Sequence, residues 1–455
     1  MARGGSAVRG LAELVTCIAI AVTLLKGFLV EGFLISTGSM APQLLGFHKR
    51  VTCPECGFEF ARGVNVDDPA SRSPLATCIN CGQTGIAITG VPRNEGDQLL
   101  VHKLPWVFSQ VKRWEPIVFR RPGRATMAFV KRVIGLPGES VQIRGGDVHV
   151  DGRLCRKTLA QQRATRVPVY DDRFRPAGGS TRWTLGRGWS DTRGRFRFKP
   201  TQAATSWLEY HHLDVDQPGP VRDRYPYNPR EPRSRTHRVR DLMLTLRAVE
   251  SVGSNRPGRL RIELDSATHR VAWVRDLGRG RQWLEIDGRK GAPVGLTGGT
   301  AEKSRVLEFS TVDQTLQATA DGRQVFPAYP LDTGKQPAVE DASGLERPLL
   351  RLGAAGGVLS ITGIRIDRDV FYRGSPRQNA TGTPWKLGPN EYFMLGDNSP
   401  VSLDSRSWSI PAVPARLIIG RPLLLHLPSR QWELRIGNSS RYIRIPDLGR
   451  IRYIR

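Results

Sequence analysis

The sequence predicts a mainly β protein, in which one N-terminal helix precedes a long series of short strands. Glycine and proline occur 48 and 32 times among 455 residues, which is typical of a chain with many tight turns. Short runs that alternate apolar and polar residues recur, for example at 141–153 and 258–266. After the first 35 residues, no long stretch shows the apolar spacing of an amphipathic helix. These three observations favour β-sheets over a helical bundle.

The first element we expect is a helix that anchors the chain in a membrane. Residues 11–25 form the only strongly apolar run, with Arg3 and Arg9 before it and Lys26 after it. Together with residues 27–30 it reaches about 20 residues, near the minimum that spans a bilayer. The basic residues before it favour an N-terminus in the cytoplasm and the rest of the chain outside. A cleaved signal peptide fits less well, because small residues in an A-x-A pattern do not follow the run.

The net charge of +26 comes mostly from arginine and bears on the class of partner. A basic protein suggests nucleic acid, but here the arginines are scattered and are not interleaved with aromatic residues in an RNA-binding motif. Attraction to anionic membrane lipids explains the charge at least as well. We therefore do not expect nucleic acid as a partner.

Four short segments carry residues that could perform catalysis. They read STGSMAP at 36–42, GDQLLVHK at 96–103, VKRVIGLPGE at 130–139 and GDNSPVSLDSR at 396–406. A serine hydroxyl is a weak nucleophile until a base accepts its proton. His102 is the only histidine in these segments, so a Ser-His-Asp triad is not the evident arrangement.

A lysine could be that base only in its neutral form. Its pKa must then lie about 2–3 units below the usual value of about 10.4. Burial among apolar residues lowers the pKa of a lysine in this way. Lys131 has Phe129, Val130, Val133 and Ile134 as sequence neighbours, which makes such an environment plausible.

Taken together and in this order, the four segments resemble the sequence boxes of the type I signal peptidase family. The resemblance implies that Ser39 is the nucleophile and Lys131 the general base. It implies that the backbone N–H of Ser39 and the hydroxyl of Thr37 stabilise the oxyanion, and that Ser402 orients the lysine. It further implies a structural ion pair of Asp404 and Arg406 near the site, with Arg132 close by. No cofactor would take part in catalysis.

Two insertions interrupt the segments of this resemblance. Cys53 and Cys56, then Cys78 and Cys81, form two C-x2-C-G motifs separated by 21 residues. Four thiolates at this spacing favour a structural zinc site, similar to a zinc ribbon. Disulfides remain the alternative if this part lies outside the membrane. A second insertion ends in strand-like segments at 240–372 that resemble concanavalin-like jelly-roll domains, so a carbohydrate or another surface ligand is a candidate partner.

These observations predict five parts of the chain. They are the cytoplasmic stub and transmembrane anchor (1–34), a signal-peptidase-type β core (35–50, 91–160 and 373–430), a zinc-ribbon-like insertion (51–90), a jelly-roll-like insertion with an Arg/Pro-rich lead (161–372), and a basic tail (431–455). The expected activity is removal of signal peptides from secreted preproteins at the outer face of the cytoplasmic membrane. The alternative is a catalytically inert adaptor that binds a surface through the jelly-roll insertion.

Overall fold

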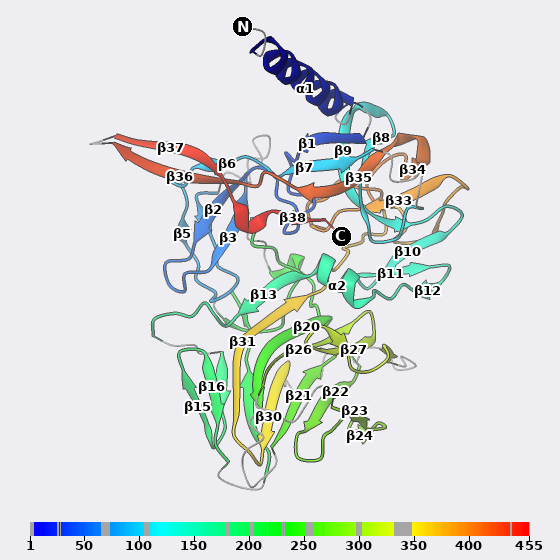
Figure 1. Cartoon of the computed structure of the whole chain (residues 1–455). Coiled ribbons are helices and arrows are strands. Elements are labelled where there is room, and N and C mark those ends of the chain that lie inside the picture. Colours follow the sequence, from blue (N-terminus) through cyan, green and yellow to red (C-terminus); the bar gives the residue numbers. More distant parts are fainter. Residues whose placement is uncertain are drawn as a thin grey trace.

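A computed structural model provides the structure of the chain. It describes residues 4–24, 27, 29–64, 73–103, 110–178, 182–200, 204–215, 217–229, 231, 233–250, 258–266, 268–296, 303–331, 348–436 and 439–454. The structure is mainly β, as predicted, and two bodies of sheet lie one above the other with helix α1 projecting from the upper one (Figure 1).

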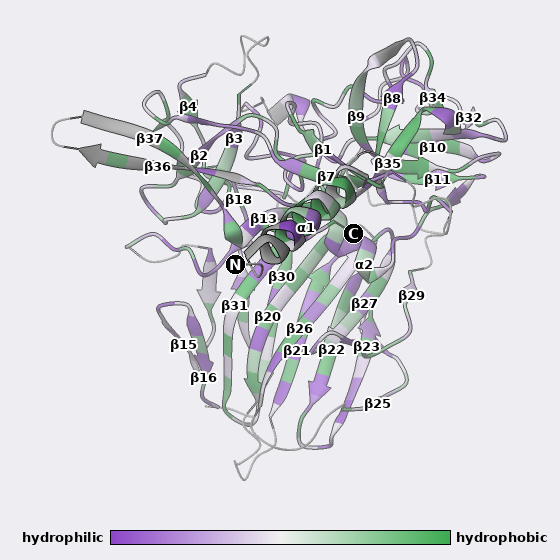
Figure 2. Cartoon of the chain, turned by 45° about the horizontal axis from the view of Figure 1, so that its top comes forward, coloured by the Kyte–Doolittle hydropathy of each residue, from purple (hydrophilic) through white to green (hydrophobic). Residues whose placement is uncertain are grey.

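Helix α1 (Gly4–Leu24) corresponds to the predicted N-terminal helix, but the prediction of a transmembrane anchor at 1–34 is not supported. Among the described residues, no helix is both long enough and apolar enough to cross a membrane. Arg9 and Glu13 form an ion pair on α1, and hydrophilic residues interrupt its hydrophobic surface (Figure 2). The predicted span also included Val30. In the structure Val30 begins strand β1 (Val30–Leu34) and pairs with His102.

The upper body contains the core sheet, in which segments distant in sequence pair. Its strand order is β1-β7-β35-β8-β9-β33-β34, and β38 pairs with β35. Besides β1 the strands are β7 (Gln98–His102), β8 (Pro116–Arg121), β9 (Arg124–Gly135), β33 (Glu391–Leu395), β34 (Ala412–Pro414), β35 (Ile418–Leu425) and β38 (Arg452–Tyr453). The short 3-10 helices Ala415–Leu417 and Leu448–Arg450 precede β35 and β38.

A four-stranded sheet packs beside this core sheet. Its order is β12-β11-β10-β32, with bounds β10 (Ser140–Arg144), β11 (Asp147–Val150), β12 (Arg153–Leu154) and β32 (Trp385–Lys386). Asp151 and Gly152 join β11 to β12 with positive φ at both positions. Asp-Gly is a pair that two-residue hairpin turns of this type favour, so the local sequence explains the turn.

The four cysteines lie in two short hairpins next to the core sheet. Strands β2 (His48–Thr52), β3 (Glu59–Gly63) and β6 (Arg93–Asn94) form one small sheet, and β4 (Leu75–Ala76) pairs with β5 (Ile86–Ala87). Val51, Phe60, Ile86 and Ile88 form their apolar core together with three buried cysteines.

The lower body is a sandwich of two antiparallel sheets. The first has the order β15-β16-β31-β20-β26-β27-β28, with β13 and β29 at its side. Its strands are β13 (Val167–Asp171), β15 (Trp189–Thr192), β16 (Arg195–Phe198), β20 (Leu242–Glu250), β26 (Lys303–Val312), β27 (Thr315–Ala320), β28 (Arg323–Gln324), β29 (Tyr329–Pro330) and β31 (Leu359–Arg368).

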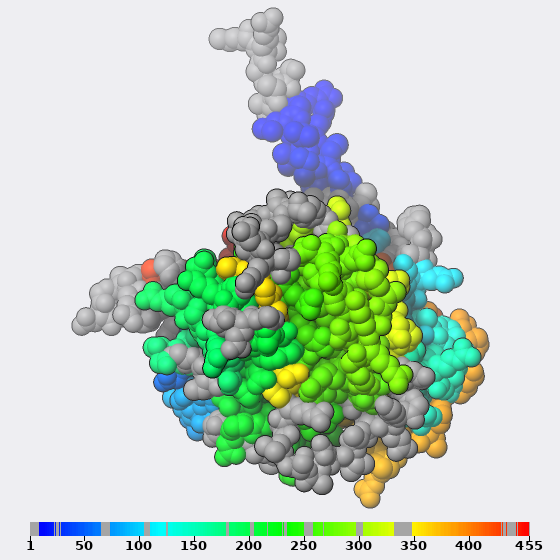
Figure 3. Space-filling view, turned by 90° about the horizontal axis from the view of Figure 1, so that it is seen from below, coloured from blue at the N-terminus to red at the C-terminus, as the bar shows by residue number. Residues whose placement is uncertain are grey.

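The second sheet of the sandwich has the order β14-β17-β30-β21-β22-β23-β24, with β25 beside β23. Its strands are β14 (Trp183–Leu185), β17 (Ser206–Tyr210), β21 (Arg259–Asp265), β22 (Arg270–Asp276), β23 (Arg281–Ile286), β24 (Arg289–Lys290), β25 (Val294–Gly295) and β30 (Leu350–Ala355). Seen from below, these strands fill the centre of the molecule (Figure 3).

Alternation along the sandwich strands explains why the two sheets face each other. Hydrophobic and hydrophilic residues alternate along them (Figure 2), so each strand presents one apolar face. Phe196, Ile262, Trp273 and Phe309 are among the side chains that fill the space between the sheets. Each fully buried side chain of this kind contributes about 1.5–3 kcal/mol relative to exposure.

The Arg/Pro-rich lead is more ordered than the sequence indicated. It contributes α2 (Leu159–Thr165), several sandwich strands, the pair β18 (Leu213–Asp214) and β19 (Gln217–Pro218), and a 3-10 turn at Arg233–Arg235. Thr158 and Gln161 form a capping box that begins α2. In the tail, β36 (Ser429–Ile436) and β37 (Ser439–Pro446) form a long hairpin that extends from the core (Figure 1).

Candidate active site

The turn that carries Ser39 follows β1 and is fixed by packing on both sides. The Ala41 N–H donates to Gly38 O at 3.1 Å, and the Leu44 N–H donates to Met40 O at 2.9 Å. The side chains of Met40 and Leu44 are buried against core-sheet residues. Ser39 is only 9% exposed, and its Oγ lies 3.5 Å from Oγ1 of Thr37. The turn therefore holds two hydroxyl groups side by side.

Asp97 of the GDQLLVHK segment ties this turn to the core sheet. Its carbonyl accepts from the Ile35 N–H at 2.9 Å, and its Oδ2 accepts from the Leu45 N–H at 2.8 Å. Arg450 from the tail donates to both carboxylate oxygens, at 2.9 and 2.7 Å. The tail thus reaches the site region, a role that the sequence analysis did not predict.

Lys131 lies on β9, directly opposite Ile117 of β8, and is 2% exposed. Burial lowers its pKa to about 8, and the positive charge of Arg406 acts in the same direction. The carboxylates of Asp404 and Asp397 oppose this lowering of the pKa, because they favour the ammonium form. Lys131 is therefore buried, and charged side chains as well as burial set its pKa.

Ser39, Thr37 and Lys131 line one cavity of about 210 Å³. Ser39 and Lys131 are 92 positions apart in sequence. The pairing of β9 within the core sheet brings them to the same cavity. Among the described residues that line this cavity there is no histidine. Lys131 is the only amine in the lining, which suits it to accept a proton there.

Ser402 lies at the back of the same turn. Gly396 separates it from Ser39, because a Cβ added at Gly396 would overlap both Oγ of Ser402 and the carbonyl oxygen of Ser39. The Ser402 hydroxyl is buried and has no hydrogen-bond partner among the described residues. An unpaired buried hydroxyl costs about 1–3 kcal/mol, so this position is costly for stability alone.

Two buried ion pairs stand behind the cavity. Arg406 binds Asp404 through Nε at 2.9 Å and Nη2 at 2.7 Å, and both side chains are almost fully buried. Arg132 pairs with Asp397 instead, through Nε at 2.7 Å and Nη2 at 2.5 Å. From the sequence, Arg132 was expected near the first pair, and Asp397 was not identified as its partner.

Asn398 is a further residue that the sequence analysis did not assign to the site. Its backbone N–H donates to the Ser39 carbonyl at 3.0 Å, and its Nδ2 donates to the Gly38 carbonyl at 2.9 Å. It therefore holds the nucleophile turn from the opposite segment. The only signal in the sequence was its place in the GDN triplet at 396–398.

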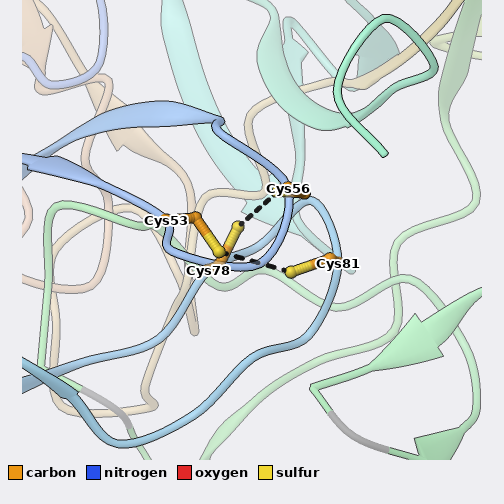
Figure 4. Close-up of side chains that lie close together, drawn as sticks. All are labelled: Cys53, Cys56, Cys78 and Cys81. Atoms are coloured by element: carbon orange, nitrogen blue, oxygen red, sulfur yellow. Dashed lines mark hydrogen bonds between the residues drawn. The ribbon is translucent and has the colours of Figure 1, made fainter. Parts of the chain in front are cut away.

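The four predicted metal ligands come together from the two hairpins (Figure 4). Their sulfur atoms all lie within 4.8 Å of one another, with Cys53 and Cys81 at 3.5 Å and Cys56 and Cys78 at 3.8 Å. The Gly57 N–H donates to Cys53 O and the Gly82 N–H to Cys78 O, so both motifs make the same turn. All four cysteines are free thiols.

The fold and the cavity define a β-sheet protein with a serine and a buried lysine in one site. A family model described as signal peptidase, peptidase S26, matches residues 92–199 and 356–426. Over these residues the chain is similar to this family of serine proteases. The matched residues include Lys131 and Ser402 but not Ser39.

Curated relatives agree with this family over short stretches. Signal peptidase I of Leptolyngbya laminosa is 43% identical over 73 residues, which are 14% of this chain and 36% of that protein. Signal peptidase I V of Bacillus subtilis is 34% identical over 70 residues, 14% of this chain and 40% of that protein. The chain thus spans less than half the length of these two relatives.

Solved structures match part of the chain at low sequence identity. A Bacillus subtilis protein of unknown function with a galectin-like fold is 9% identical, covering 44% of this chain and 96% of that one, with a TM-score of 0.28. The carbohydrate binding module CBM66 from Bacillus subtilis is 12% identical, covering 41% and 96%, with a TM-score of 0.26. TM-scores this low define neither the fold nor a ligand of the insertion, whose predicted carbohydrate partner stays a prediction.

Proposed function

We propose that this chain is an endopeptidase that removes signal peptides from secreted preproteins through an acyl-enzyme on Ser39. The observation that carries the proposal is the shared cavity of Ser39, Thr37 and Lys131, in which burial lowers the pKa of the lysine to about 8. The match of residues 92–199 and 356–426 to the signal peptidase family model supports the substrate class. The outer face of the cytoplasmic membrane is part of the proposal, because preproteins are delivered there.

The first step is attack by Ser39 on the carbonyl carbon before the scissile bond. Lys131 accepts the hydroxyl proton as the bond forms, and later gives a proton to the leaving amine. With a pKa of about 8, a substantial fraction of Lys131 is neutral near pH 7–8 and can act as the base. The unpaired Ser402 hydroxyl is the group that we assign to orient the amine.

The tetrahedral intermediate carries a negative oxygen that needs donors. We assign the backbone N–H of Ser39 and the hydroxyl of Thr37 to this role, since both belong to the same turn. The pairs Asp404–Arg406 and Arg132–Asp397 add no donor in this scheme. They keep the loop of residues 396–406 fixed around the lysine.

The direct test is cleavage of a preprotein by purified full-length protein in lipid vesicles. Ser39→Ala and Lys131→Ala should each lower the rate more than about a thousandfold, because nucleophile and base act as one unit. Ser190→Ala and Lys199→Ala, both exposed on the insertion, are matched controls that should keep the wild-type rate. Wild-type activity in either site variant would show that another group performs the reaction.

We also propose that the four cysteines hold a structural zinc ion. Zn–S bonds of about 2.3 Å in a tetrahedron place sulfur atoms about 3.8 Å apart, whereas a disulfide requires about 2.05 Å. Two of the sulfur–sulfur separations here, 3.5 and 3.8 Å, are close to the tetrahedral value. Because four thiolates complete the tetrahedron, the ion would stabilise the hairpins and would take no part in hydrolysis.

Metal analysis separates the two readings of the cysteines. The wild-type protein should contain about one zinc per chain, and Cys53→Ser should lose it with a lower melting temperature. Cys155→Ser is the matched control, since that thiol lies outside the cluster. Absence of zinc together with two disulfides by mass spectrometry would establish the alternative.

The division of the chain into parts belongs to the same proposal. We propose that the core sheet with the four-stranded sheet forms the catalytic unit, and that the cysteine hairpins and the sandwich are insertions into it. Strand β1 pairs with β7 and strand β38 with β35. The catalytic unit therefore takes strands from the segments predicted as anchor and tail.

A further inference from the structure

A segment of the second insertion, Tyr225–Pro229, lies directly against the nucleophile turn. It belongs to the stretch 200–355, which the family model does not match. Tyr225 is buried, and its Oη donates to the Asp397 carbonyl at 2.6 Å. The guanidinium of Arg368 lies over the same ring at 4.6 Å and donates to the Arg224 carbonyl at 2.7 Å. The sandwich strand β31 thus holds the segment in place from below.

Tyr227 is in contact with both the nucleophile turn and the cysteine hairpin. A Cβ added at either Gly38 or Gly63 would overlap its ring, so the ring rests on the bare backbone of both glycines. Its Oη donates to the Phe47 carbonyl at 2.8 Å, and its own carbonyl accepts from the Gly63 N–H at 2.8 Å. The ring is 7% exposed and is fixed from several sides.

Asn228 reaches the nucleophile through Asn398. The two side-chain amides form a reciprocal pair, each Nδ2 donating to the other Oδ1 at 2.7 Å. Asn398 donates its second Nδ2 hydrogen to the Gly38 carbonyl and its backbone N–H to the Ser39 carbonyl. Asn228 therefore fixes the amide orientation of the residue that holds the turn.

The same segment closes one side of the catalytic cavity. Tyr227, Asn228 and Pro229 line the cavity that contains Ser39 and Lys131. Asn228 and Pro229, with Arg62, also line a second, larger cavity of about 380 Å³. The segment is thus a wall between two spaces, and the wall is supplied by the insertion.

We propose that Tyr227 is a specificity-determining residue and Asn228 a positioning residue for the peptidase reaction, an inference that rests on the proposed function. Tyr227 limits the size of the substrate side chain that fits beside Ser39. Asn228 keeps Asn398, and through it the Gly38 and Ser39 carbonyls, in the geometry that the oxyanion donors require. The insertion would then adjust the substrate range of the catalytic unit.

The test of Tyr227 compares preproteins that carry Ala, Leu or Phe before the scissile bond. Tyr227→Ala should raise the Leu-to-Ala and Phe-to-Ala ratios of kcat/KM by about tenfold or more, because truncation opens the wall and pockets discriminate side chains by 10–200-fold. Tyr227→Phe keeps the ring and should leave both ratios near the wild-type values. Tyr329→Ala, exposed on the sandwich, is the control for loss of a tyrosine elsewhere in the insertion.

The test of Asn228 separates positioning from binding. Asn228→Ala should lower kcat by about tenfold to a hundredfold with little change in KM, because a small displacement of a reacting group has effects of this size. A residue with a purely structural role would change the melting temperature and leave kcat per folded molecule unaltered. Thermal unfolding and active-site titration with a serine-directed acylating reagent supply that correction.

The possible results distinguish a failure of this inference from a failure of the proposed function. If wild-type protein cleaves and Ser39→Ala does not, unchanged ratios in Tyr227→Ala and unchanged kcat in Asn228→Ala overturn the inference and leave the function standing. If Tyr227→Ala does not fold, Tyr227→Leu replaces it, and the Asn228 result decides independently for its residue. Absence of cleavage by the wild-type protein overturns the proposed function and this inference with it.

Discussion

At the scale of single residues, Lys131 connects the activity to pH. Only the neutral amine accepts a proton, and with a pKa of about 8 roughly one-tenth of the molecules are in that form at pH 7. We predict that kcat/KM rises about tenfold between pH 7 and 9 and then levels off. A profile measured on a soluble preprotein peptide checks this, with thermal unfolding at each pH as control. A rate that is constant from pH 7 to 9 would contradict the assignment of Lys131 as base.

The same burial predicts that Lys131 lowers the stability of the fold. Its folded pKa lies below the unfolded value, so between pH 8 and 10 the native state binds fewer protons and the free energy of unfolding rises with pH. Lys131→Met removes the buried charge and should raise the free energy of unfolding by about 3 kcal/mol at pH 7.

Denaturant titration at pH 7 and pH 10 measures this gain. The difference from wild type should shrink as the pH approaches 10, where wild-type Lys131 is neutral in the folded state. Lys199→Met, at an exposed lysine, should give no gain at either pH. A Lys131→Met protein less stable than wild type at pH 7 would refute the burial argument.

Residues differ in how far the sequence could identify them. Ser39, Thr37 and Lys131 were predicted from the resemblance of four short segments to the type I signal peptidases, and the structure places all three around one cavity. Tyr227, Asn228 and the Arg132–Asp397 pair were not predicted. Their contacts join positions more than 150 residues apart, and no local pattern records such a pairing.

At the scale of elements, the hairpin of β10 and β11 meets the sandwich through an excess of carboxylates. Asp147 lies with Asp241 and Asp313, and Lys157 pairs with Asp313 and Asp369 at 2.8 Å each. Burial, with the negative charges of Asp313 and Asp369, raises the pKa of Asp147 to about 7, although Lys157 opposes it.

This contact should weaken as the pH rises. Because the folded pKa of Asp147 lies above its unfolded value, stability is greatest below pH 4 for this group and is lost as the pH rises to about 7. Asp147→Asn should therefore raise the free energy of unfolding by about 1–2 kcal/mol at pH 8, with a smaller gain at pH 5. Asp151→Asn, in the turn between β11 and β12, is the control, and an equal gain from both variants would argue against this account.

Elements were predicted best where alternation was strong. Strands expected from alternation at 241–249, 258–265, 270–275, 305–310, 315–319 and 358–366 correspond to β20, β21, β22, β26, β27 and β31. The stretch 156–240 showed no clear strand pattern in the sequence. Its strands are short, and they are stabilised by pairing with β30 and β31, which lie far away in sequence. The predicted transmembrane span included Val30, which belongs to β1, and no described helix is long and apolar enough to cross a membrane.

At the scale of the whole molecule, three parts of the chain meet at the Tyr227 ring: the nucleophile turn, the cysteine hairpin and the second insertion. The bare backbone of Gly63 makes this meeting possible. Gly63→Ala adds a methyl group that overlaps the ring and should push the insertion away from the catalytic cavity. We predict a loss in kcat/KM of about tenfold or more for this variant. Gly90→Ala is the control: Gly90 lies on the first insertion, as Gly63 does, but a methyl group there meets open space and should have no effect.

A second change at the partner residue shows whether the loss arises at this contact. If the methyl group acts through the Tyr227 ring, Gly63→Ala combined with Tyr227→Leu should recover much of the rate on a small-residue substrate, because the smaller side chain leaves room. Gly63→Ala combined with Tyr227→Phe keeps the ring and should stay impaired. Equal rates in the two double variants would mean that Gly63 affects the site by another route, such as distortion of β3.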